Sequence, residues 1–277
     1  MKEQKKKGKT LFFVIWITLI LGLLAAIFII GIPKEHAETI KEAMKDGVLH
    51  ETNKISLFGI IDVNPALISA YIVTAMLLLT ALLIRLFALP RFKEVPGKLQ
   101  SVIEKLVEFF NDMAKGHSPH KTTFVAAYIF SAGVYIFFGT LFELFGVQAL
   151  TTQGHSVALP APLADINAAI AMGVLSYLVI LGAGLIVNGL RGGLSVLKDF
   201  SLPISMSFRL FGALLSGMLV TELVYYYAIL SFVLPVVVGV LFTLLHAVIQ
   251  TYVLATLVSV FYGEAVEPKK KKEKVKK

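Results

Sequence analysis

The apolar stretch over residues 204–262 limits what this chain can fold into more than any other feature. As one straight helix it would be about 90 Å long, roughly three times the hydrocarbon thickness of a bilayer. The stretch must therefore fold back on itself, and we place the turn at residues 231–235, which end in a proline. Two long antiparallel helices are expected in this part of the chain.

Four earlier apolar runs are also long enough to cross a membrane, which takes about 20 residues. They cover residues 11–32, 64–89, 122–147 and 166–190. With 57% hydrophobic and 16% charged residues and a mean hydropathy of +0.80, the chain is too apolar for a soluble fold of 277 residues. The expected fold class is an all-α integral membrane protein with about six transmembrane helices.

The N-terminal part is expected to differ from the rest. The run 11–32 follows a basic start, exceeds the usual length of a signal-peptide core and precedes no small-x-small cleavage site. An uncleaved signal anchor is therefore favoured over a cleaved signal peptide. Residues 1–63 are assigned to a basic segment, the anchor helix and an outer segment, and residues 64–277 to a membrane domain with a basic tail.

Basic residues gather at one set of membrane ends. Six spans with the N-terminus inside put residues 2–9, 91–121, 191–198 and 269–277 on the cytoplasmic side. The outer loop 148–163 has no Lys or Arg, and the outer segment 33–62 balances its lysines with carboxylates. This positive-inside pattern explains the net charge of +8 by topology, so nucleic acid is not expected as a partner.

An amphipathic segment, residues 95–116, lies between the second and third predicted spans. It starts after a Pro-Gly pair and is predicted to be a helix lying flat on the inner membrane surface. Its apolar face holds Leu99, Val102, Ile103, Leu106, Phe110 and Met113. The helix either only spaces the two spans or docks a partner.

Ionisable side chains inside a membrane span are costly, so each is a functional candidate. The polar candidates within the spans or near their outer ends are Arg209, Glu143, Glu222, His246, Asp165 and Asn167. With the N-terminus inside, these carboxylates lie in the outer half, whereas Arg209 lies in the inner-to-middle zone. Acidic groups on one side of a single fixed cation are what a water-filled path leading to an electrostatic barrier requires.

Arg209 shares a helix face with small side chains only. The residues at helical spacings from it are Ser205, Gly212, Ala213 and Ser216. Small side chains let another helix approach closely, so this face suits a surface that moves past a partner. The alternative is ordinary helix packing, with Arg209 bonded to a neighbouring carbonyl.

The last predicted helix carries a polar stripe of Thr243, His246 and Gln250. For His246 alone, a hydrogen-bonded core histidine is at least as good an account as a functional one. Arg209 suits a permanent barrier, because arginine keeps its charge whereas a buried lysine readily loses its proton. If a carboxylate on a moving partner must give up its proton near Arg209, ion flow becomes tied to the movement of that partner.

Four segments carry a resemblance to a known family. They are SMSFRLFG at 205–212, IQTYVLATLVSVFY at 249–262, VPGKLQ at 95–100 and PLADINAAIAM at 162–172. In order and spacing they resemble subunit a of the F-type ATP synthases, the ion-conducting stator of the membrane sector. The resemblance covers most of the chain from about residue 64 onward.

The resemblance implies a non-catalytic subunit of five or six helices, the last two forming a long, tilted hairpin. Two half-channels for H⁺ or Na⁺ meet near Arg209, with Gln250 beside it. The implied partners are the c-subunit ring, the b-subunit peripheral stalk, other ATP synthase subunits and membrane lipid, with no cofactor and no metal. We expect a multi-pass protein of a bacterial plasma membrane with both termini in the cytoplasm.

This chain departs from the family pattern at three positions. Many members have Asn and Glu at the positions of Ala213 and Met218, and some have His at the position of Thr243. Glu222 and His246 are therefore considered as displaced substitutes.

A pairing of Glu222 with His246 is not expected. If Arg209 lies level with Gln250 in an antiparallel hairpin, Glu222 and His246 are about 14 Å apart along the axis. Glu222 is therefore assigned to the outer path with Glu143, and His246 remains either a relay or a polar neighbour of Arg209.

Two other classes of membrane protein compete with this interpretation. A membrane protein insertase also uses a lone intramembrane arginine, but it needs no outer carboxylates. A secondary transporter is expected to show an internal repeat, which this chain lacks. No Walker-type phosphate loop is present, so the chain is not expected to make or hydrolyse ATP itself.

Overall fold

Five helices in the described part of the chain are long and apolar enough to cross a membrane. The computed structural model describes residues 54–57, 61–119, 122–152, 154, 156–226 and 234–268, together with residues 17, 18 and 22. Apart from those three positions, the predicted first span, 11–32, lies outside the described residues, as do residues 231–233 of the predicted turn. The all-α, multi-span fold class is confirmed.

Helix α3 (Pro65–Leu83) begins at a well-defined cap. The Asn64 side chain accepts a hydrogen bond from the backbone N–H of Ala66 at 3.0 Å, and Pro65 takes the first helical position, where no N–H is needed. The helix continues as a π-helical turn (Ile84–Ala88) and a 3-10 turn (Leu89–Arg91). Pro90 cannot donate a backbone hydrogen bond, so the regular α-helical pattern ends before it.

Helices α4 (Lys98–His117) and α5 (Thr122–Phe142) follow, and α4 confirms the helix predicted from the amphipathic pattern. Its C-terminal half packs on α5 and α8, where Phe110 is buried and forms an edge-to-face pair with Phe130 of α5. The N-terminal half leaves Leu99 and Val102 exposed. The apolar face of α4 is therefore covered by protein at one end only.

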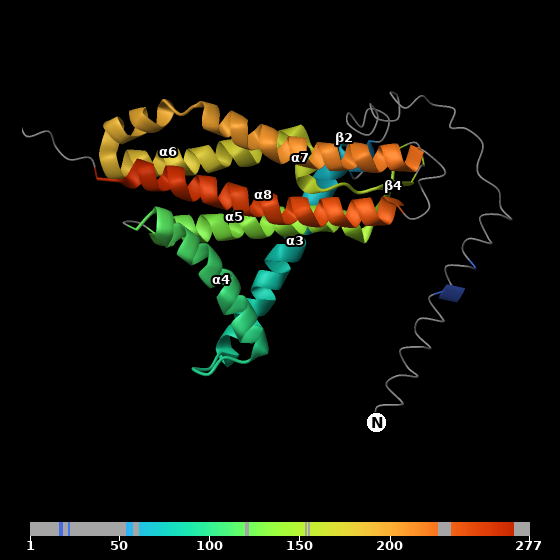
Figure 1. Cartoon of the computed structure of the whole chain (residues 1–277), viewed down its shortest axis with the longest axis horizontal. Coiled ribbons are helices and arrows are strands. Elements are labelled where there is room, and N and C mark those ends of the chain that lie inside the picture. Colours follow the sequence, from blue (N-terminus) through green and yellow to red (C-terminus); the bar gives the residue numbers. More distant parts are fainter. Residues whose placement is uncertain are drawn as a thin grey trace, which may run out of the picture.

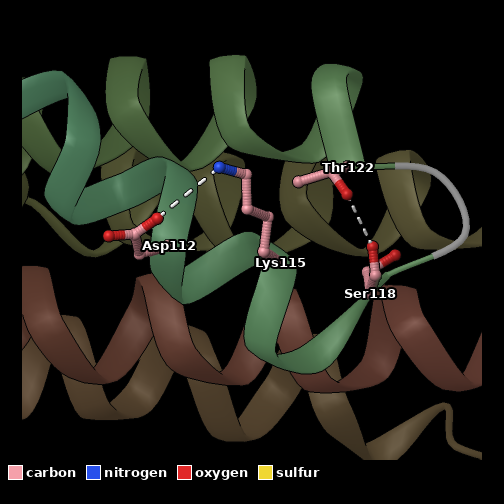
Figure 2. A network of polar contacts seen from close by, with 4 residues as sticks. All are labelled: Asp112, Lys115, Ser118 and Thr122. Carbon is pink, nitrogen blue, oxygen red and sulfur yellow. Dashed lines mark hydrogen bonds and ion pairs between the residues drawn. The ribbon is translucent and has the colours of Figure 1, made fainter.

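Short-range polar contacts occupy the corner between α4 and α5 (Figure 2). The Thr122 hydroxyl donates to the backbone carbonyl of Ser118 at 3.0 Å, and Asp112 pairs with Lys115 at 3.7 Å on the exposed side of α4. On α8, a Cβ added to Gly263 would collide with the His117 carbonyl. The last part of α8 therefore meets this corner backbone to backbone.

Two small antiparallel hairpins occur among the described residues: β1 (Ile55–Leu57) pairs with β2 (Ile61–Val63), and β3 (Gln148–Leu150) with β4 (Ser156–Ala158). In the second hairpin Gln148 lies opposite Ala158, and the Ser156 hydroxyl donates to the Gln148 side chain at 2.6 Å. This hairpin lies between two 3-10 turns, η3 (Glu143–Phe145) and η4 (Pro162–Ala164). The short connection keeps the end of α5 and the start of α6 at one end of the bundle.

Helix α6 (Ile166–Leu197) is broken at Gly189, whose φ of 61° and ψ of −155° are not helical. After the break the chain turns back, so that the Tyr177 hydroxyl donates to the Val196 carbonyl at 3.3 Å. The close approach needs glycine, because a Cβ at Gly192 would collide with the Gly184 carbonyl. Residues 191–197, for which the sequence predicted only a place on the cytoplasmic side, thus form a helical segment that packs against the part of α6 before Gly189.

Helices α7 (Ser201–Tyr226) and α8 (Leu234–Val266) form the predicted pair of long helices. α7 begins three residues before the predicted apolar stretch, and α8 begins inside the predicted turn. Figure 1 shows α5, α6, α7 and α8 lying side by side, and they share one hydrophobic core. Its most buried side chains include Ile129, Ile136, Ile180, Met206, Leu210 and Val258.

The break in α6 gives the first testable prediction. The backbone conformation of Gly189 is essentially restricted to glycine, so Gly189→Ala is expected to destabilise the fold by about 1–3 kcal/mol. Gly182→Ala is the matched control on the same helix, because a Cβ there meets no atom within 4 Å. Thermal unfolding of the full chain in detergent, followed by circular dichroism, compares the two. Equal melting temperatures would contradict this account of the break.

Candidate functional site

Arg209 lies on an exposed face of α7. The opposite face packs into the core through Met206, Leu210 and Leu214, which are all buried. Because these three anchor one side of α7, the Arg209 side is turned away from the other helices. Among the described residues, Arg209 makes no hydrogen bond and no ion pair.

The small residues predicted to share the face of Arg209 are placed around it. Ser205, Gly212 and Ser216 are exposed, and Ala213 is half-buried. The Ser216 hydroxyl donates to the Ala213 carbonyl of its own helix at 2.8 Å, so it needs no outside partner. This face, called the Arg209 face below, therefore offers a shallow surface with one long cationic side chain.

Gln250 lies on the buried side of α8 and is only 6% exposed. Its Oε1 atom accepts no hydrogen bond within the described structure. A buried carbonyl oxygen without a donor costs about 1–3 kcal/mol. The next residue, Thr251, donates to the Gly133 carbonyl of α5 at 3.3 Å. No hydrogen bond joins Gln250 to Arg209, which is on the exposed side of the neighbouring helix.

His246 is half-buried between α7 and α8. Its ring lies 5.8 Å from that of Phe242, and its Nδ1 and Cε1 atoms would be 3.4 Å from a Cβ added at Gly217. This contact sets a different register for the hairpin from the expected one. With His246 level with Gly217, the α-carbon of Glu222 is only about 7 Å further along the axis, half the expected separation.

The candidate carboxylates lie at the end of the bundle that holds the β3–β4 connection. Glu143 is half-buried in the turn after α5, and Asp165 caps α6 by accepting from the backbone N–H of Asn167 at 2.9 Å. The Asn167 side chain also donates to Asp165, at 3.2 Å, and is exposed. Glu222 lies near the C-terminal end of α7, and the environment of its side chain is outside the described structure.

Close contacts between helices give the spacing of these groups along the bundle. Gly173 of α6 faces Ser207 of α7. At about 1.5 Å per residue, this contact places Asp165 about 9 Å from Arg209 along the axis, toward the end of the bundle that holds β3 and β4. Similarly, Thr251 of α8 faces Gly133 of α5.

Combined with the contact between Gly217 and His246, the α5–α8 register puts Glu143 about level with Glu222. Both are then about 20 Å beyond Arg209 along the axis. The carboxylates therefore follow Arg209 at increasing distances in one direction.

Sequence reasoning missed the glycines that set these registers, namely Gly133, Gly173 and Gly217. A glycine inside an apolar helix is a signal for close helix packing, but it does not say which helix approaches. Asn188 was also given no role, although its Nδ2 donates to the carbonyls of Ala265 and Glu267 at 2.8 and 3.0 Å. It thereby satisfies backbone acceptors at the end of α8 that have no partner within that helix.

A comparison with protein families finds that the family described as ATP synthase A chain matches residues 68–263. The chain belongs to the ATP synthase A chain family. The match extends from the first turn of α3 into the last turn of α8 and includes Arg209, Gln250 and all the candidate carboxylates.

Subunit a of the ATP synthase A chain family is the proton-conducting stator of F-type ATP synthase. This chain is accordingly a non-catalytic, ion-conducting, multi-pass membrane component. Family membership implies the other ATP synthase subunits as partners, and it decides against the insertase and the secondary transporter. Among the described residues, no group of three or more His, Asp and Glu side chains could hold a metal ion.

The contact between α6 and α7 gives a second prediction. A Cβ at Gly173 would lie 2.8 Å from the Pro203 carbonyl and would collide with the Ser207 hydroxyl, so Gly173→Ala should push α7 away from α6. Overpacking of this kind costs about 1–3 kcal/mol. We expect a lower melting temperature and reduced proton pumping by the assembled complex. Gly182→Ala on the same helix should change neither, and an unaltered Gly173→Ala complex would contradict the register.

Proposed function

We propose that this chain passes ions to and from a rotating ring of c subunits through two half-channels, and so couples ion flow to rotation and ATP synthesis. The observation that carries the proposal is Arg209, an exposed cation without a partner in the described structure, on the shallow Arg209 face of α7. A partner helix can approach this face closely because Ser205, Gly212 and Ser216 are small.

Arg209 would act as a fixed barrier between the two half-channels. Its charge cannot be removed by burial, so it keeps the carboxylate of a passing c subunit ionised while that carboxylate is nearby. A proton must therefore leave the carboxylate before Arg209 and return after it. This forces the ion to travel with the ring instead of crossing directly.

Glu143, Glu222, Asp165 and Asn167 would line the outer half-channel, in agreement with their place at one end of the bundle. Along the axis they lie about 6 Å (Asn167), about 9 Å (Asp165) and about 20 Å (Glu143 and Glu222) from Arg209, and this spacing supports a stepwise path toward the barrier. Between them, His246 is level with Gly217, about 12 Å beyond Arg209. That position supports a role as a relay and not as a neighbour of Arg209.

Gln250 would contribute from α8 to the surroundings of the barrier. Its buried Oε1 has no donor in the described structure, so it is available to a water molecule that enters with the ion. We assign the domain 64–277 to this membrane machinery and the segment 1–63 to anchoring. The setting we propose is a bacterial plasma membrane with both termini in the cytoplasm, and the peripheral-stalk b subunits complete the stator.

Arg209→Ala tests the barrier. We expect ATP-driven proton pumping by inverted membrane vesicles, followed with a pH-sensitive dye, to fall by at least about a hundredfold, since the guanidinium acts directly on the passing carboxylate. Arg191→Ala, which removes an exposed arginine from the folded-back part of α6, is the matched control and should pump normally. Full ion-driven ATP synthesis by the Arg209→Ala complex would defeat the proposal.

Glu143→Gln tests the outer path. Loss of this half-buried carboxylate should slow proton-driven ATP synthesis about tenfold, which corresponds to about 1.4 kcal/mol in the barrier to ion entry. Glu104→Gln removes an exposed carboxylate of α4 at a distance from the path and serves as the control. Both complexes should keep the melting temperature of the parent. Equal rates of synthesis for the two variants would remove Glu143 from the path.

A further inference from the structure

A cavity of about 810 Å³ opens where the end of α3 meets the beginning of α4. Figure 1 shows these two helices converging at the corner formed by residues 84–98, well apart from the bundle of α5 to α8. The cavity, called the α3–α4 corner below, contains none of the residues assigned to ion translocation. It lies within the range of volumes of ordinary ligand sites, about 300–1,000 Å³.

The walls of the α3–α4 corner are amphipathic. The apolar part comes from the end of α3, the π-helical turn after it and the first turn of α4, and includes Leu83, Phe87 and Leu99. The charged residues that line it are all basic, namely Arg91, Lys93 and Lys98. The corner therefore combines an oily wall with three cations and no carboxylate.

The segment that carries the cations is held in place by a buried side chain. Gln100 is only 9% exposed, its Nε2 donates to the Lys93 carbonyl at 2.8 Å, and its Oε1 accepts from the Lys93 N–H at 3.0 Å. The same Nε2 atom also donates to the carboxylate of Glu104 at 2.7 Å. Glu104 does not line the cavity. Gln100 thus ties the backbone at Lys93 to the first turn of α4.

The apolar surface continues from the corner along α3. Met76, Leu83 and Phe87 share the helix face that lines the corner and are 47, 46 and 56% exposed, so nothing in the described structure covers this side of the helix. A hydrocarbon chain that starts at the corner could therefore follow α3 toward the middle of the membrane. A free phosphate ion would pair with the cations but would leave the apolar wall of the cavity exposed to solvent.

We propose that the α3–α4 corner binds an anionic phospholipid, with its phosphate at Arg91, Lys93 and Lys98 and an acyl chain along α3. Basic pockets between helices at a membrane surface are suited to such headgroups. The phosphate neutralises the cations, and the acyl chain covers the apolar wall. An apolar protein helix packed here would remove three cations from water without supplying an anion, which is unfavourable. The lipid would fix the angle between α3 and α4. This inference needs only the multi-pass membrane setting, so it stands apart from the proposed ion path.

Native mass spectrometry of the full chain in detergent tests the proposal, with phosphatidylglycerol and phosphatidylcholine as probes. We expect phosphatidylglycerol to bind at least tenfold more tightly than phosphatidylcholine, and Arg91→Gln combined with Lys98→Gln to remove that preference. The control is Lys105→Gln with Lys115→Gln, two exposed lysines of α4 that do not line the corner. Equal binding of the two lipids, or an equal effect of both double variants, would overturn the proposal, as would displacement of phosphatidylglycerol by millimolar inorganic phosphate.

A photo-crosslinking amino acid at Phe87 tests which molecule occupies the corner in the whole complex. After illumination of intact membranes, we expect adducts with phospholipid, identified by their mass on peptides of α3. The same group at Phe124, an exposed position on α5 away from the corner, reports the background of lipid contact. Adducts with anionic lipid that are enriched at Phe87 over Phe124 support the site. Crosslinks from Phe87 to another protein subunit, or no enrichment, would refute it.

Discussion

The arrangement of this membrane domain depends on close approach of helix backbones at glycine. Lipid is as apolar as a leucine side chain, so burial of oily surface does not bring helices together as it does in water, and tight packing must supply the attraction. Gly133 lies between the ring of Phe110 and the side chain of Thr251, Gly173 lies against Ser207, and Gly217 lies against His246. These three contacts join α4, α5, α6, α7 and α8 in a fixed register.

The same contacts decide which side chains face outward. Once Gly173 is seated against Ser207, the buried side of α7 is determined, and Arg209 is on the other side. The position of the cation is therefore a consequence of packing on the opposite face of its helix. The segment after Gly189 also helps to place α7. It folds back along α6, so that α7 starts beside the middle of α6.

Much of the architecture was predictable because it follows from length and polarity. The long apolar stretch had to fold in two, the amphipathic pattern predicted α4, and helical spacing placed Ser205, Gly212 and Ser216 on the side of Arg209. The helix after Gly189 was not predictable in this way, since nothing in its composition distinguishes a cytoplasmic loop from a segment that packs on its own helix. The level of His246 against α7 also escaped prediction, because helical periodicity orders residues within a helix but gives no offset between helices. The roles of the individual polar residues remain predictions.

The exposed position of Arg209 has a consequence for the biogenesis of the subunit. A cation near the centre of a lipid-facing helix costs about 2.5–3.5 kcal/mol on insertion scales, and local thinning of the bilayer or water defects lower that cost only by disturbing the membrane. An isolated copy of this chain bears this penalty in full, whereas a copy beside an anionic partner does not. Unassembled copies are therefore expected to be less stable in the membrane than copies that lie beside such a partner.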